Sequence, residues 1–432
     1  MGKMLDQFSI GKDLKDPIIL FGLFWYVVLT LVLALFVGNF WAAVCFSLAA
    51  YAVIGNDAVQ TLMTYLHSNS DIPWKYLYGG VAAVLLWVLW FGFLTNGWDI
   101  TYGRLDAKWY TGINIEWYIV IFPLILVFLT RFRGIPVSTS LLILSIFASE
   151  LLFQKIVMKS ALGYLVAFIA SFSMWCIVEV ILKKAAKTAK TNTPNFIGMV
   201  IQAWVWAAVI MVAIAYAIIP LILQGFPTVE IPAVSNGQLA LYSSVAFLFV
   251  LWVLYERKTD AKVSRGSTFW RLAQTFTTAL LFSTWLMHDM VNIAVFLPQT
   301  LSINIMVLVS FIFILGLAYT FRIKWWPVWN IVTNKTSTNE IVAATMIDLV
   351  YFVILLIFKE WSNIPMSTTW VFVWLLAGRQ LAIRSINRVW VVESKDRFKI
   401  AFKEIWKDFS KIMVGLGISV VALIIVRAIT NT

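Results

Sequence analysis

Two polar motifs each occur twice along the chain, in the same order. In the first copy an Asn-Asp pair at 56–57 is followed by Pro-Val-Ser-Thr-Ser at 136–140, with 81 residues from Asp57 to Ser138. In the second copy a His-Asp pair at 288–289 is followed by Pro-Met-Ser-Thr-Thr at 365–369, with 78 residues from aspartate to serine. Repetition of both order and spacing predicts a duplicated unit whose halves build one polar site together.

The surroundings of these motifs are strongly apolar. The chain is 61% hydrophobic and 12% charged, with mean hydropathy +0.88. A soluble domain has about 45–50% apolar and about 25% charged residues, so the composition excludes an ordinary soluble fold. Runs of about 20 apolar residues, long enough to cross a bilayer as helix, recur along the chain. The sequence therefore predicts an all-α polytopic membrane protein with thirteen hydrophobic segments: 17–37, 41–66, 77–95, 116–131, 136–154, 161–183, 196–224, 238–255, 269–297, 302–321, 341–358, 366–386 and 411–430.

Basic residues predict the orientation of these segments. Lysine and arginine follow segments six, eight, ten and twelve, whereas the loop 225–237 has neither. Because cytoplasmic loops are enriched in lysine and arginine, this pattern places the N-terminus and the basic loops in the cytoplasm. Lys155 and Lys159 fall in a predicted outer loop and count against the scheme. The net charge of +12 is then explained by orientation, and no nucleic-acid partner is expected. Short loops and two cysteines favour a bacterial inner membrane.

The number of segments predicts how the two copies relate. Each repeat has six segments, 17–183 and 238–430, joined by 184–237, which holds a basic loop and a connecting transmembrane helix. An odd number of membrane crossings separates each position of the first repeat from the equivalent position of the second. The second repeat is therefore inverted relative to the first. Secondary transporters commonly have this architecture, with the site near the midplane. Segments 116–154 and 341–386 either span the membrane or form re-entrant helical hairpins, and the sequence leaves both readings open.

The aspartates predict a cation site. Asp57 and Asp289 stand inside apolar runs, where ionisable residues are costly and usually functional. Two carboxylates close together hold a cation or share a proton. Amide and imidazole neighbours complete the predicted cation-binding set, which comprises Asn56, Asp57, Gln60, His288, Asp289 and Asn292. The coupling ion is Na⁺ or H⁺. His288 titrates near neutral pH and favours H⁺, or it replaces an asparagine as a neutral side chain.

The Ser/Thr motifs predict an anion site. Proline begins each motif, which fits the first turn of a helix, and free N–H groups at a helix N-terminus attract anions. Three consecutive hydroxyls exceed what one helix cap needs. The predicted substrate-binding residues are Ser138, Thr139, Ser140, Ser367, Thr368 and Thr369.

Other features carry less weight. Glu150 and Arg379 are equivalent by repeat and opposite in charge, so they are candidates for a salt bridge. The sequence shows no nucleophile–base pair, metal-ligand cluster or phosphate-binding glycine loop. We therefore expect no enzymatic activity, no cofactor, and no metal other than a coupling Na⁺.

At these motifs the chain resembles the inorganic phosphate transporter (PiT, or Pho-4) family. Members carry Gly-Ala-Asn-Asp-Val-Ala-Asn-Ala in each half and later Pro-Val-Ser-Thr-Thr-His. Here Gln60 replaces the second asparagine of copy one, His288 replaces the first asparagine of copy two, and the final histidine is Leu141 or Trp370.

The resemblance implies import of inorganic phosphate with Na⁺ or H⁺ by alternating access, through two inverted repeats with hairpins that carry the Ser/Thr motifs. It implies that the six hydroxyls bind the anion, and that Asp57 and Asp289 bind the cation and contact the substrate. The departures leave two alternatives, a sulfate permease and a transport-inactive scaffold or sensor. The partners expected are an oxyanion and the lipid bilayer, and the sequence leaves open whether the chain forms a homodimer.

Overall fold

The computed structural model describes residues 17–105, 110, 114–132, 135, 137–189, 265–323, 341–360, 366–390 and 395–430. The described residues are predominantly helical and form no β-strand. The all-α prediction is therefore confirmed for this part of the chain. The predicted segments 196–224 and 238–255 lie outside the described residues, as does nearly all of the connecting region.

Five helical stretches are long and apolar enough to cross a membrane. They are Pro17–Val37 (α3), Phe40–Ser68, Trp74–Thr95 (α6), Glu150–Cys176 and Ile303–Arg322. The stretch α3 is only 11% buried, which is the pattern of an apolar helix that faces lipid, whereas Phe40–Ser68 is 83% buried. Length, apolar composition and apolar exposure together are those of an integral membrane protein.

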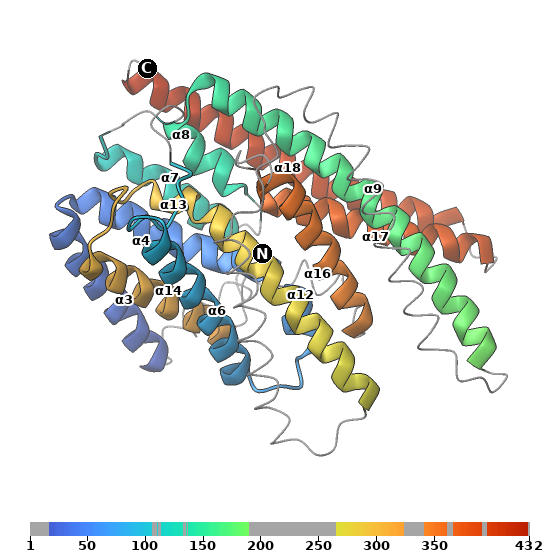
Figure 1. Ribbon diagram of the computed structural model, residues 1–432. Helices are drawn as coiled ribbons and strands as arrows, with labels where there is room; N and C mark the ends of the chain where they lie inside the picture. The colour runs from blue at the N-terminus through green and yellow to red at the C-terminus, as the bar shows by residue number, and fades with distance from the viewer. Residues whose placement is uncertain are drawn as a thin grey trace.

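The helices form two groups with a central layer between them (Figure 1). α3, α4 (Phe40–Val53), α6 and α14 (Ile303–Ile323) pack together, and α9 (Glu150–Ala189) packs against α17 (Thr368–Trp390). Between these groups, α12 (Arg265–Asp289) contacts α16 (Ile341–Leu355), α6 and α5 (Val59–Ser68). Segments far apart in the sequence therefore meet in the centre of the molecule.

A hairpin of short helices brings the first Ser/Thr motif to this centre. Its first arm is the apolar helix Trp117–Arg131, which includes α7 (Ile121–Val127). At 1.5 Å per residue this arm is about 22 Å long, shorter than the bilayer core of about 30 Å. The return arm is shorter and ends with α8 (Ser145–Phe147), after which Ala148 is extended. The segment predicted over 136–154 is thus too short to span, and the lengths favour the re-entrant reading.

A second hairpin brings the other motif to the same place. α16 continues into a π-helical turn, Leu356–Glu360, and α17 begins at Thr368. The first hairpin also ends its inward arm in a five-residue π-turn, Phe128–Phe132. The fourth residue of each turn is basic, Arg131 in one and Lys359 in the other.

The structure corrects the predicted loop between segments five and six. Residues 155–160 lie inside α9, which runs unbroken from Glu150 to Ala189, and the chain breaks at Ala148 instead. The polar residues Lys155 and Lys159 resemble a loop in the sequence, but lysine is a good helix former. Lys159 is 2% exposed, so it lies in the interior and not in an outer loop.

The basic stretch predicted as a loop after segment twelve is also largely helical, because α17 extends to Trp390 and α18 spans Lys395–Thr430.

The predicted Glu150–Arg379 salt bridge does not form. The Arg379 guanidinium carbon lies 4.5 Å from the ring centroid of Trp175, near the other end of the membrane-length part of α9. Glu150 and Trp175 are separated by 25 helical residues, or about 37 Å. Glu150 is exposed at the start of α9. Arg379 therefore interacts with the ring of Trp175 and not with Glu150.

Candidate functional site

Interrupted helices position both aspartates. Asp57 lies in a π-turn, Ile54–Ala58, between α4 and α5 (Val59–Ser68). Asp289 is the last residue of α12, which is separated by Met290 from the short helix α13 (Val291–Ala294). Such turns displace backbone and side chains from the regular helical positions and are frequent at functional sites. Both carboxylates are 1% exposed, deep among the apolar helices.

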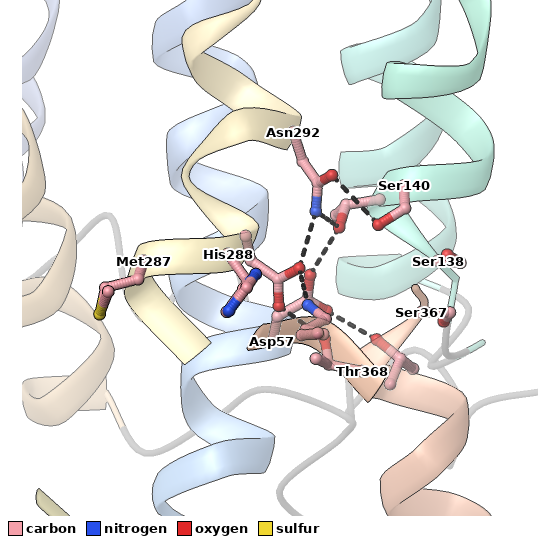
Figure 2. A network of polar contacts seen from close by, with 12 residues as sticks. Asp57, Ser138, Ser140, Met287, His288, Asn292, Ser367 and Thr368 are labelled. Carbon is pink, nitrogen blue, oxygen red and sulfur yellow. Dashed lines mark hydrogen bonds and ion pairs between the residues drawn. The ribbon is translucent and has the colours of Figure 1, made fainter. Parts of the chain in front are cut away.

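The Asp57 carboxylate accepts hydrogen bonds from both Ser/Thr motifs (Figure 2). Thr139 Oγ1 donates to Oδ2 at 3.0 Å and Thr369 Oγ1 donates to Oδ1 at 2.8 Å. Asn56 Nδ2 donates to Oδ1 at 2.5 Å. The tips of the two hairpins therefore meet at one carboxylate. This contact joins the two halves at the place where the repeated motifs predict a shared site.

The Asp289 carboxylate has a similar set of donors and one additional cation. Thr368 Oγ1 donates to Oδ2 at 2.8 Å and Asn292 Nδ2 donates to Oδ1 at 3.0 Å. Lys359 Nζ lies 2.6 Å from Oδ1, and both side chains of this ion pair are 1% exposed. The second aspartate is thus neutralised by a residue from the second hairpin tip.

Asn292 joins the two carboxylate centres. Its Nδ2 also donates to Thr139 Oγ1 at 3.0 Å, and its Oδ1 accepts from Ser140 Oγ at 3.1 Å. Thr139 donates in turn to Asp57, so the network is continuous from one aspartate to the other. The two carboxylates and the residues around them therefore form a single buried site.

The other predicted residues lie around this network. Gln60 Nε2 donates to Asn56 Oδ1 at 2.9 Å, one turn along the same helix. His288 Nε2 lies 3.3 Å from a guanidinium nitrogen of Arg104, so the histidine contacts a cation. Ser138 Oγ accepts from Leu141 N at 3.2 Å, as an N-terminal cap does.

Ser367 differs from the other five hydroxyl residues. Its Oγ is buried at the start of α17, and among the described residues it makes no hydrogen bond of normal geometry. Tyr164 Oη lies near Ser367 Oγ, and it too makes no hydrogen bond of normal geometry among the described residues. Buried polar atoms are nearly always paired in folded proteins. The Ser367 hydroxyl lies at the N-terminus of α17, where free N–H groups attract anions.

Three basic residues near the site were not among the predicted site residues. Lys359, Lys159 and Arg104 come from a hairpin tip, from α9 and from the loop after α6, and their charges lie close enough to act on one another. Lys159 is followed by Ser160, whose Oγ accepts from Ser367 N at 3.4 Å. The sequence signal for Lys359 is weak: it lies eight residues before Ser367, and the basic residue of the first copy, Arg131, lies seven before Ser138.

A row of buried polar contacts continues from this site toward one end of the molecule. The Asp348 carboxylate of α16 accepts from Thr64 Oγ1 of α5 and, at 2.6 Å, from Thr278 Oγ1 of α12. One to two turns further along the same helices, Gln274 Nε2 donates to Ser68 Oγ at 2.6 Å. The interface of α5 and α12 is therefore lined with hydroxyl, amide and carboxylate groups within an otherwise apolar core.

Comparison with known proteins found no similar protein. No family model, no curated protein and no solved structure matches the chain.

Proposed function

We propose that the protein is a secondary transporter that carries inorganic phosphate, or a closely similar tetrahedral oxyanion, across the membrane by alternating access. One observation carries the proposal: two hairpin tips with Ser/Thr motifs meet two aspartates and three basic residues in the interior of an apolar helical protein. Buried ionisable groups in a membrane protein usually mark a path for ions or substrates.

The charges around the site suit an anion. The carboxylates of Asp57 and Asp289 lie near three basic side chains, those of Lys359, Lys159 and Arg104. An oxyanion beside two carboxylates would be repelled without such cations. The N-termini of the return arms add further positive potential and free N–H groups. Phosphate therefore has both charge partners and hydrogen-bond donors here.

Matching details in the two halves support inverted repeats. Thr139 donates to Asp57 and the equivalent Thr368 donates to Asp289, each within its own half. Ser140 and Thr369, also equivalent, each donate to a residue of the other half. Reciprocal contacts of this kind are what a pseudo-twofold axis through the site produces. Rocking one half about such an axis would expose the site to each side in turn.

Contacts between helix ends support the predicted orientation. Arg271 forms an ion pair with Asp71 at 2.6 Å, and the charge pattern predicts a cytoplasmic position for both. At the other end Leu301 N donates to Trp98 O at 3.0 Å, and both are predicted outside. The polar row from Asp348 to Gln274 runs toward the predicted cytoplasmic end. We assign it as the inner half of the substrate route.

Uptake by the purified protein in liposomes tests the proposal. Radiolabelled phosphate would be offered outside, with Na⁺ and H⁺ gradients imposed separately and protein-free liposomes as the control. Phosphate accumulation that requires one gradient supports symport and identifies the coupling ion. Accumulation of sulfate alone would reassign the substrate. Failure of folded protein to move either anion would contradict the proposal and favour a scaffold or sensor.

Ser367→Ala separates a ligand role from a structural role. Removing a hydroxyl that is unpaired in the structure should leave the midpoint of thermal unfolding unchanged or higher. Loss of one hydrogen bond to a charged ligand, about 1.5–3 kcal/mol, should raise the KM for phosphate about 10- to 100-fold.

Ser171→Ala is the matched control for that variant. Ser171 Oγ donates to Leu375 O at 2.6 Å, buried and remote from the hairpin tips. This variant should lose stability and keep the KM of the wild type. An unchanged KM for Ser367→Ala would remove Ser367 from the binding site.

A further inference from the structure

The Lys359–Asp289 ion pair bears on how many cations accompany the substrate. We propose that the Lys359 ammonium is the resident cation of Asp289, so that this carboxylate takes up no mobile Na⁺ during transport. The inference rests on the proposed function, because it concerns the coupling ion of that site. It departs from the expectation that both aspartates bind the coupling cation.

Asp289 already has a cation partner in the structure. Oδ1 receives the ammonium at 2.6 Å and the Asn292 amide at 3.0 Å, and Oδ2 receives the Thr368 hydroxyl at 2.8 Å. A lysine ammonium is a compact single positive charge, as a monovalent metal ion is. Because the ammonium is covalently attached to the chain, it neutralises the carboxylate without being supplied from solution.

The position of Lys359 in the hairpin fixes this arrangement. The π-turn Leu356–Glu360 directs its side chain inward, where it is 1% exposed. Taking an ammonium and a carboxylate out of water is costly, and such pairs persist only when they are joined closely and hydrogen-bonded. The pair is joined at hydrogen-bond distance, and Asp289 keeps two further donors, which satisfies that condition.

In the part of the first half that the structure describes, no corresponding ion pair is present. Arg131 occupies the equivalent position in its π-turn but interacts with Tyr51. Among the described residues Asp57 forms no ion pair, and its carboxylate accepts only from Asn56, Thr139 and Thr369. The two aspartates are thus equivalent in sequence and different in charge compensation. Of the two aspartates at the hairpin tips, Asp57 alone is left to hold a mobile cation, so this pair of carboxylates couples at most one.

Lys359→Met tests the assignment by removing the ammonium while retaining an unbranched apolar side chain. We expect Na⁺ to stabilise this variant in detergent without phosphate, by about 2 °C or more at saturating Na⁺ relative to choline, beyond any response of the wild type. The double variant Lys359→Met/Asp289→Asn should lose this added response, since the unpaired carboxylate is gone. Lys75→Met, an exposed lysine on α6, is the matched control and should behave as the wild type.

Two results would overturn the assignment. One is an equal Na⁺ response in the wild type and in Lys359→Met. The other is a transport stoichiometry of two Na⁺ per phosphate in the wild type, and this measurement decides the question if Lys359→Met does not yield folded protein. The stabilisation assay contains no phosphate, so a failure to transport phosphate would not be mistaken for failure of this inference.

Discussion

Asp57→Asn is expected to reduce phosphate uptake at least 100-fold. The wild-type carboxylate accepts hydrogen bonds from Asn56, Thr139 and Thr369, and two of these donors come from the hairpin tips. Asparagine keeps the shape but presents an N–H₂ group to one or more of these donors and removes the charge. Hydrogen bonds to a charged group contribute about 1.5–3 kcal/mol each, so losing two corresponds to about 10²- to 10⁴-fold.

Initial rates of radiolabelled phosphate uptake in liposomes measure this effect, with reconstituted protein quantified in each preparation. Glu150→Gln is the charge-matched control, because Glu150 is exposed at the start of α9 and makes no contact with the site. It should keep at least half of the wild-type rate. An Asp57→Asn protein that is folded and transports at the wild-type rate would refute the central role of this carboxylate.

Gly378→Ala is expected to be the most destabilising single methyl addition among the described glycines. A Cβ at this position would lie 2.4 Å from Phe168 O and 3.1 Å from Phe172 N, both backbone atoms of α9. Backbone cannot rotate away as a side chain end can, so α9 and α17 would have to separate. Overpacking of a close contact costs about 1–3 kcal/mol and sometimes more, and the larger end is expected here.

Thermal unfolding in detergent, followed by the loss of monodisperse protein, measures this effect. Gly417→Ala on α18 is the control, since a Cβ there would meet nothing within 4 Å. That variant should gain up to about 1 kcal/mol of stability, because alanine favours helix over glycine. Because α17 begins with Thr368 and Thr369, Gly378→Ala should also slow uptake. Equal unfolding midpoints for the two variants would show that α9 and α17 are not in close contact.

The polar centre was the most predictable part of the molecule. Aspartates and hydroxyls stand out against apolar runs, and their repetition indicated that both halves contribute to one site. The structure brings Asp57, Asp289, Asn292 and the threonines of both motifs into one hydrogen-bonded network. Substrate and ion specificity were expected from family resemblance, and they stand here as proposals.

The basic side of the site could not be predicted. Lysine and arginine near segment ends usually mark the membrane surface, so Lys159 was assigned to an outer loop and Lys359 was not singled out. The burial of Lys359 depends on the position of its hairpin tip inside the protein, and that of Lys159 on the unbroken course of α9 against α17, which are tertiary features. The continuous helix α9 was predicted as two segments because charged residues interrupt its apolar pattern. The residues that bury Lys159 are distant in the sequence, so neighbouring residues give no sign of that burial.

The close contact of α9 with α17 also constrains the order in which the molecule can be assembled. Ser171 on α9 donates its hydrogen bond to Leu375, a residue synthesised 204 positions later. At about 5–20 residues per second, α9 leaves the ribosome roughly 10–40 s before its partner exists. During that interval the groove around Phe168 and Phe172 faces lipid or a chaperone. The first half therefore completes its packing only after the second half has been synthesised and α17 has docked on α9.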